Sequence, residues 1–214
     1  MPTFQTPQPI AVAVDVPCGD VTVIASDRTD TVVEIRPAVA SSKADVRAAQ
    51  EIQVEFVGGK LTVETPKKWK TIRPFGGTAT LSVTIEVPSG SVLDATLAMG
   101  RLASVGEYDQ CDLEVAAGDI VVERPRGSVT AKTAKGNIRV DDAARGVLRL
   151  ETSMGDLEVG IRRGSAARLE VNAMYGNVQN LMDPVDQSQE SGDVVQVIAR
   201  NLYGNVVIGH GALV

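Results

Sequence analysis

The side chains that most often carry catalysis are scarce in this sequence. It has one histidine, His210, which stands between two glycines near the end of the chain and is expected to be an exposed tail residue. Cys111 falls at an apolar repeat position, which predicts a packed small hydrophobe, and Cys18 falls at a repeat corner without a basic neighbour to activate it. No nucleophile elbow, phosphate loop or metal-ligand cluster is recognisable. The sequence therefore predicts no enzyme, no cofactor and no metal site.

Aspartate or asparagine follows a glycine at six recurring positions: Asp20, Asp119, Asn137, Asp156, Asn177 and Asn205. A stacked column of carboxylates and amides could bind Ca²⁺. The same residues also bridge tight turns, and the Ca²⁺-binding nonapeptide pattern is absent. A turn role is the favoured interpretation.

Three arginines recur 19 and 18 residues apart at a second type of corner: Arg126, Arg145 and Arg163. Stacked along one edge, they would form a strip able to hold a polyanion or an acidic partner. The alternative, which we favour, is that the side chains extend into water or pair with the nearby acids Glu123, Asp141 and Asp142.

A basic segment with exposed-type aromatics is the best candidate for binding a protein partner. Between Pro66 and Gly77 it contains the only tryptophan and four basic residues, and its candidate residues are Lys67, Lys68, Trp69, Lys70, Arg73 and Phe75. Aromatic side chains beside cations are typical interface anchors. The alternative is a loop that folds back and caps the end of a repeat stack.

The composition limits the class of protein. Hydrophobic residues make up 43% of the 214 residues but aromatics only 3%, so the core must be built from small aliphatics. A net charge of −6 argues against general nucleic-acid or anionic-lipid binding. The opening residues carry neither a basic stretch nor a long apolar segment, so we expect no signal peptide, no membrane insertion and a cytoplasmic location.

The elements that position these residues are short repeats. Glycine, a polar residue and an aliphatic strand recur at Gly100, Gly118, Gly136, Gly155, Gly176 and Gly204, in steps of 18, 18, 19, 21 and 28 residues, and an earlier copy begins at Gly19. Around each glycine, apolar and polar positions alternate as in strands with one buried face. The repeats predict strands joined at glycine corners.

The outward positions favour parallel stacking of these strands. Their charges are complementary between consecutive copies, as in Glu114 with Lys132, Arg139 with Glu158, and Arg149 with Glu170. Parallel, in-register coils bring such positions together. The sequence therefore favours a β-solenoid, similar to a parallel β-helix, of two-strand coils of about 18–21 residues, although a meander of antiparallel hairpins stays open.

The N-terminal part, residues 1–88, is β-rich but irregular, with strands expected over 10–16, 21–25, 31–36, 52–57, 61–64 and 80–87. Residues 41–50 predict one short helix with a serine cap. Only the turn at 87–90 separates this part from the coils of 89–214, so we expect one continuous domain.

Several segments together resemble a known family. These are Asp15–Val23, Gly59–Pro66, Val83–Gly90 and the Gly-Asp/Asn repeats, with Leu150–Gly160 most similar to soluble actinobacterial members. They resemble the bacterial β-strand-repeat family labelled "putative adhesins" of unknown function, which is related to the toast-rack domains of envelope-stress proteins. The resemblance implies the repeat fold and no established catalytic residue, and the adhesin label implies a surface protein.

The favoured hypothesis for function is a non-enzymatic cytoplasmic scaffold or protein-interaction module. Its partner is unidentified or is a second copy of the chain, bound at the ends of the stack or at exposed strand edges. The alternative is a binding protein for a polyanion or polysaccharide laid along the arginine edge. An enzyme of the polysaccharide-lyase kind comes third, because no clustered carboxylates are visible.

Overall fold

The computed structural model describes residues 1–66, 79–182 and 193–211. Aliphatic and polar residues alternate through most of these segments, so the chain forms strands with one buried face. The described residues are all-β with one helix, as the sequence predicts. The helix is α1 (Lys43–Glu51), and the strands are β1 (Thr3–Gln5), β2 (Ala11–Ser26), β3 (Asp30–Pro37), β4 (Gln53–Val57), β5 (Lys60–Glu64), β6 (Leu81–Pro88), β7 (Ser91–Ala117), β8 (Ile120–Lys135), β9 (Ile138–Ala143), β10 (Gly146–Met154), β11 (Leu157–Ile161), β12 (Ala166–Tyr175), β13 (Val178–Asn180), β14 (Val194–Tyr203) and β15 (Val206–His210).

Helix α1 begins at the predicted serine cap. The Ser42 hydroxyl accepts a hydrogen bond from the Asp45 N–H at 3.3 Å, which satisfies one of the free donors of the first turn. The buried Asp45 carboxylate in turn accepts the N–H groups of Val39 and Thr80, each at 3.2 Å. These bonds fasten the helix to the residues that precede β6. No helix among the described residues is long and apolar enough to cross a membrane.

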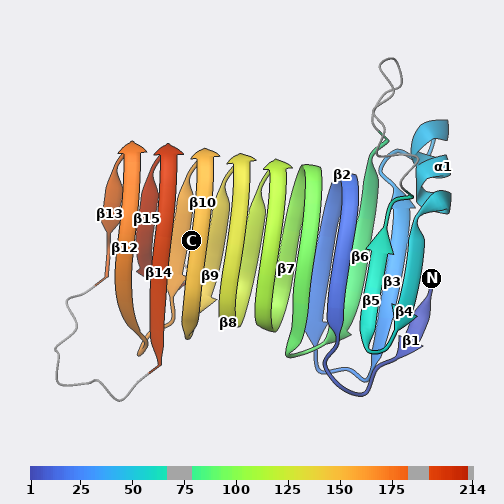
Figure 1. The fold of residues 1–214 in the computed structure, drawn as a ribbon, viewed down its shortest axis with the longest axis horizontal. Coiled ribbons are helices and arrows are strands. Elements are labelled where there is room, and N and C mark those ends of the chain that lie inside the picture. Colours follow the sequence, from blue (N-terminus) through green and yellow to red (C-terminus); the bar gives the residue numbers. More distant parts are fainter. Residues whose placement is uncertain (67–78, 183–192, 212–214) are drawn as a thin grey trace.

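Strands of successive repeats pair in parallel along the molecule (Figure 1). The residues two places after the corner glycines are register partners, from Leu102 through Ile120 and Ile138 to Leu157. Their side chains are fully buried. The outward charges meet as the sequence predicts: Glu114 lies opposite Lys132, and Arg139 lies opposite Glu158 with 3.9 Å between guanidinium and carboxylate.

The last two repeats do not stack in the order of the sequence. Strand β14 lies between β10 and β12, and β15 lies between β11 and β13, as Figure 1 shows. After β11 the chain therefore first forms the outermost strands, β12 and β13. It then returns as β14 and β15, which lie between these strands and the preceding repeat. The prediction that Arg149 and Glu170 are neighbours is therefore wrong, since Ile198 of β14 lies between them.

The first long strand, β2, lies inside the stack. Strand β2 pairs in parallel with β7, and Gly19 lies opposite Gly100. On its outer side β2 carries β5 and β6, to which β4 and β3 add in antiparallel fashion, and β1 adds to β3. Helix α1 contacts β3 and β6 at the same end (Figure 1). The N-terminal end is thus covered by antiparallel strands and a helix.

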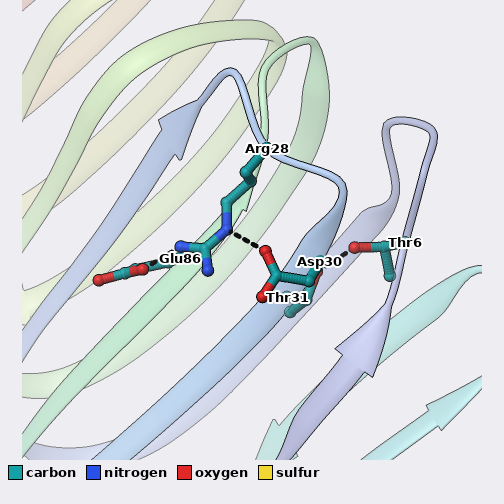
Figure 2. Close-up of polar contacts among 5 residues, drawn as sticks. All are labelled: Thr6, Arg28, Asp30, Thr31 and Glu86. Atoms are coloured by element: carbon teal, nitrogen blue, oxygen red, sulfur yellow. Dashed lines mark hydrogen bonds and ion pairs between the residues drawn. The ribbon is translucent and has the colours of Figure 1, made fainter.

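Polar contacts reinforce this N-terminal cover (Figure 2). Arg28 forms an ion pair with Glu86 of β6 and donates to Asp30 of β3 at 2.9 Å. The Asp30 hydrogen bond is the main cause of a raised pKa for Arg28, and Arg28 lowers the pKa of the Asp30 carboxyl. Behind this pair, the buried hydroxyls of Thr6 and Thr31 bond to each other at 2.8 Å.

Candidate protein-interaction surface

The glycine corners bring the backbones of neighbouring repeats very close together. Gly118 has a φ of +144°, and a Cβ placed on it would lie 1.7 Å from the carbonyl oxygen of Gly100. Only glycine provides both this conformation and this approach. The glycine column therefore fixes the corner, and with it the side chains that precede and follow each glycine.

The Asp/Asn column that follows the glycines is used for bonds between repeats. The side-chain oxygen of Asp119 accepts the N–H of Asn137 at 2.8 Å, and the Asn137 oxygen accepts the N–H of Asp156 at 2.8 Å. Asp156 accepts from Asn205 at 2.7 Å, and Asn205 accepts from Asn177 at 3.2 Å. Each side chain thus bridges one turn to the next, which is the favoured turn interpretation. No group of three His, Cys, Asp or Glu residues that could hold a metal occurs within the described ranges.

At the C-terminal end of the stack, the residues that directly precede the corner glycines are apolar and exposed. Met154, Tyr203 and Tyr175 are register partners across β10, β14 and β12. The two tyrosine rings stack with 4.8 Å between centroids and 11° between planes, and Tyr175 and Tyr203 are 59% and 49% exposed. Met174 and Leu202 are two further exposed apolar side chains at this end. We call the five residues together the tyrosine corner: Met154, Met174, Tyr175, Leu202 and Tyr203.

The tyrosine corner was not among the predicted sites. The repeat alignment places these residues in a corner column, but Tyr175 and Tyr203 are 28 residues apart in sequence, and sequential stacking gives no reason to single out their two rings. Their contact arises because β14 and β12 are neighbours. The usable signal was the change in this column from Ala117 and Lys135 to Met and Tyr.

The predicted partner-binding segment cannot be placed. Its residues lie in 67–78, outside the described residues: Lys67, Lys68, Trp69, Lys70, Arg73 and Phe75. Both interpretations of that segment, a cap and an interface, stay predictions.

Two of the three predicted strip arginines are brought together. The Arg145 guanidinium Nε donates to the carbonyl oxygen of Arg126 at 3.0 Å, and Arg126 pairs with Glu107 at 3.0 Å. Arg163 lies in the exposed turn that leads to β12, which pairs with β14 and not with β10. The three acids considered as partners instead meet other arginines: Glu123 lies 3.7 Å from Arg124, Asp141 2.7 Å from Arg139, and Asp142 2.7 Å from Arg162.

The cysteines and the histidine are inside the fold. Cys111 is buried, as predicted, and burial raises the pKa of its thiol to about 12. Cys18 is also buried, with its sulfur 3.8 Å from the Thr80 hydroxyl. The expectation of an exposed tail is wrong for His210, which is half-buried in β15 opposite Ile161 because the last strand continues the β11 ladder.

Comparison with known proteins adds a family and a shared fold. The family model described as Toastrack DUF4097 matches residues 102–203. A structure from Clostridium sporogenes, described as a "putative cell adhesion protein", is 13% identical, with 98% of each chain covered and a TM-score of 0.58. A "putative adhesin" from Bacteroides fragilis is 13% identical over 97% of this chain and 95% of that one, with a TM-score of 0.42. No curated protein matches significantly.

The Clostridium structure shows that the fold is shared over nearly the whole chain. The family match begins at Leu102, so the N-terminal segments that contributed to the resemblance lie outside it. The matched region holds most of the glycine corners and ends at Tyr203, within the tyrosine corner. Residues 102–203 of this chain thus match the toast-rack family model, in agreement with the resemblance.

Proposed function

We propose that this protein is a non-enzymatic protein-interaction module, a β-solenoid scaffold of the cytoplasm, and that the tyrosine corner is its binding surface. The observation that carries the proposal is the stacked, half-exposed pair Tyr175 and Tyr203 beside exposed methionines. Tyrosine supplies a large contact area at low conformational cost, and contiguous exposed apolar side chains mark interaction sites.

The corner is held on rigid elements. Tyr203 belongs to β14, which pairs on both sides, with β10 and with β12. The glycine after it is locked against the next repeat, since a Cβ on Gly204 would lie 2.0 Å from the carbonyl oxygen of Gly155. A preorganised surface loses less side-chain freedom on binding. The Clostridium protein's description as a cell adhesion protein agrees with a binding role.

The proposed absence of catalysis is supported by the state of the polar side chains. The thiol of Cys111 has a raised pKa. The side-chain oxygens of the Asp/Asn column accept hydrogen bonds from backbone N–H groups. A cytoplasmic location is supported by two free, buried cysteines. The alternative of polyanion binding has less support, because only Arg126 and Arg145 stack and Glu107 offsets the charge of Arg126.

Partner capture from native lysate tests the proposal. The bait is the full chain, compared with the double variant Tyr175→Ser/Tyr203→Ser. Val57→Ser is the control, because Val57 is an exposed apolar residue on β4, in the N-terminal part of the chain. We expect the double variant to lose proteins that the wild type and the control both retain. An identical set of captured proteins for all three baits would contradict the proposal.

A further inference from the structure

The C-terminal end of the stack presents free strand edges. Among the described strands, β12 pairs only with β14 and β13 only with β15. The Ala166 N–H donates to the Asp193 carbonyl on the β14 side at 3.0 Å. Because backbone groups of successive residues point to opposite sides of a strand, those of Ala167, Leu169 and Val171 face the free edge. These groups are available to another strand.

The inner side chains of these outermost strands are also incompletely covered. In β10 and β14 the inward residues, such as Leu148 and Val197, are fully buried, whereas Leu169 and Val171 of β12 are only half-buried. In the second sheet, Val178 of β13 is 49% exposed, although its partner Val206 is fully buried. The core therefore continues to the end of the stack without a cover among the described residues.

The sequence of β12 is complementary to itself in the antiparallel direction. If two copies meet with Leu169 opposite Leu169, then Arg168 of each lies opposite Glu170 of the other. Arg168 and Glu170 are both exposed, and neither has an ion-pair partner among the described residues. The same alignment places Ala167 opposite Val171, so the edge-facing backbone groups of Ala167, Leu169 and Val171 all find partners.

We propose that a second copy of this chain binds this edge, with β12 antiparallel to β12 about a twofold axis at Leu169. The axis is perpendicular to the sheet that holds β12, so the inward faces of the two β12 strands lie on the same side of the joined sheet. The inference rests on the proposed role as an interaction module and names one partner for it.

Sedimentation equilibrium of the full chain over a range of concentrations tests the proposal by charge exchange. Arg168→Glu puts like charges opposite each other twice in the dimer, so the dissociation constant should rise by about tenfold or more. The double variant Arg168→Glu/Glu170→Arg restores opposite charges and should restore the wild-type dissociation constant. Arg149→Glu is the control, since it makes the same charge change on β10 between the uncharged partners Thr130 and Ile198.

A second variant tests the backbone pairing. Ala167→Pro removes an N–H that faces the free edge, and proline is tolerated at such positions of edge strands. It should abolish the dimer while circular dichroism shows an unchanged fold. A wild-type protein that stays monomeric at every concentration would overturn the proposal, as would a dimer unaffected by the charge exchange. Either result leaves the tyrosine corner testable by partner capture, so the two failures are distinguishable.

Discussion

The stack of strands terminates differently at its two ends. At the N-terminal end, the chain adds antiparallel strands and a helix outside β2, and Val33, Leu61 and Val63 of these outer strands are fully buried. At the C-terminal end, β12 and β13 are built like the inner strands but leave Val178 and Leu169 partly exposed. The N-terminal end is closed by a different structure, whose outermost strands β1 and β4 each pair on one side only among the described strands, whereas the C-terminal end is a repeat without a neighbour.

The difference teaches where a stacked protein can form contacts. Each repeat contacts only its neighbours, so an end without a cap presents both backbone groups and apolar side chains. At the N-terminal end, polar side chains form hydrogen bonds with one another, as the Thr6–Thr31 and Arg28–Asp30 bonds show (Figure 2). The exposed tyrosine corner lies near the open end and not near the closed one.

The largest expected effect on stability comes from substituting the outermost glycines of the corner column, Gly19 and Gly176. A Cβ on Gly19 would lie 2.0 Å from the Leu81 carbonyl oxygen, at a φ of +145°, between β6 and β7. Gly19→Ala should therefore lower the free energy of unfolding by about 3 kcal/mol or more. A Cβ on Gly176 would lie 1.8 Å from the Gly204 oxygen, but its φ is not positive and β13 can shift outward.

Gly176→Ala should consequently cost less than half as much, about 1 kcal/mol. Urea unfolding of both variants and the wild type provides the measurement. Equal losses in the free energy of unfolding for the two variants would mean that the C-terminal end is held as firmly as the N-terminal end. That result would contradict the proposed difference between the two ends.

Much of this fold could be predicted from the sequence, because the repeat signal is local. Alternation placed Leu102, Ile120 and Ile138 in the core, and the glycines marked the corners. Complementary charges predicted the parallel pairing of β7 with β8 and of β9 with β11. The helix and its serine cap were also predicted, since capping depends only on neighbouring residues.

The order of the last two repeats could not be predicted in the same way. Equivalent repeats have equivalent sequences, so their alignment does not say which one is outermost. The exchange of β14 and β12 brings Tyr175 to Tyr203 and separates Arg149 from Glu170. The candidate site depends on that exchange, and the sequence therefore directed attention to the arginines and the 67–78 segment instead.

The next effect concerns the buried hydroxyl pair at the closed end. Thr31→Val leaves the Thr6 hydroxyl buried without its partner, which should lower the free energy of unfolding by about 1–3 kcal/mol. The double variant Thr6→Val/Thr31→Val removes both hydroxyls and should recover most of that loss. A double-mutant cycle by urea unfolding measures the coupling, and additive losses would show that the pair does not hold this end.

A smaller effect is expected at the tyrosine corner. Tyr175→Ala removes a stacked but mostly exposed ring at the open end, so the free energy of unfolding should fall by about 1 kcal/mol or less. Thermal unfolding of dilute protein provides the measurement, with Met99→Ala as a control at an exposed corner position in β7. A loss as large as that of Gly19→Ala would make the corner part of the core instead of a free surface.

The smallest effect is a dependence on pH at the closed end. Arg28 lowers the pKa of Asp30 below its ordinary value of 3.8, so the folded state favours the charged carboxylate. The stabilisation is therefore fully present above that value and is lost as the pH falls through the lower pKa of the folded protein. The urea midpoint of the wild type should exceed that of Asp30→Asn at neutral pH, and the two should converge below 3.8. Because Asp30 is partly exposed, solvent screens the pair and the difference should be small. A constant difference down to the acid limit of folding would assign the contribution of Asp30 to its hydrogen-bond geometry instead of its charge.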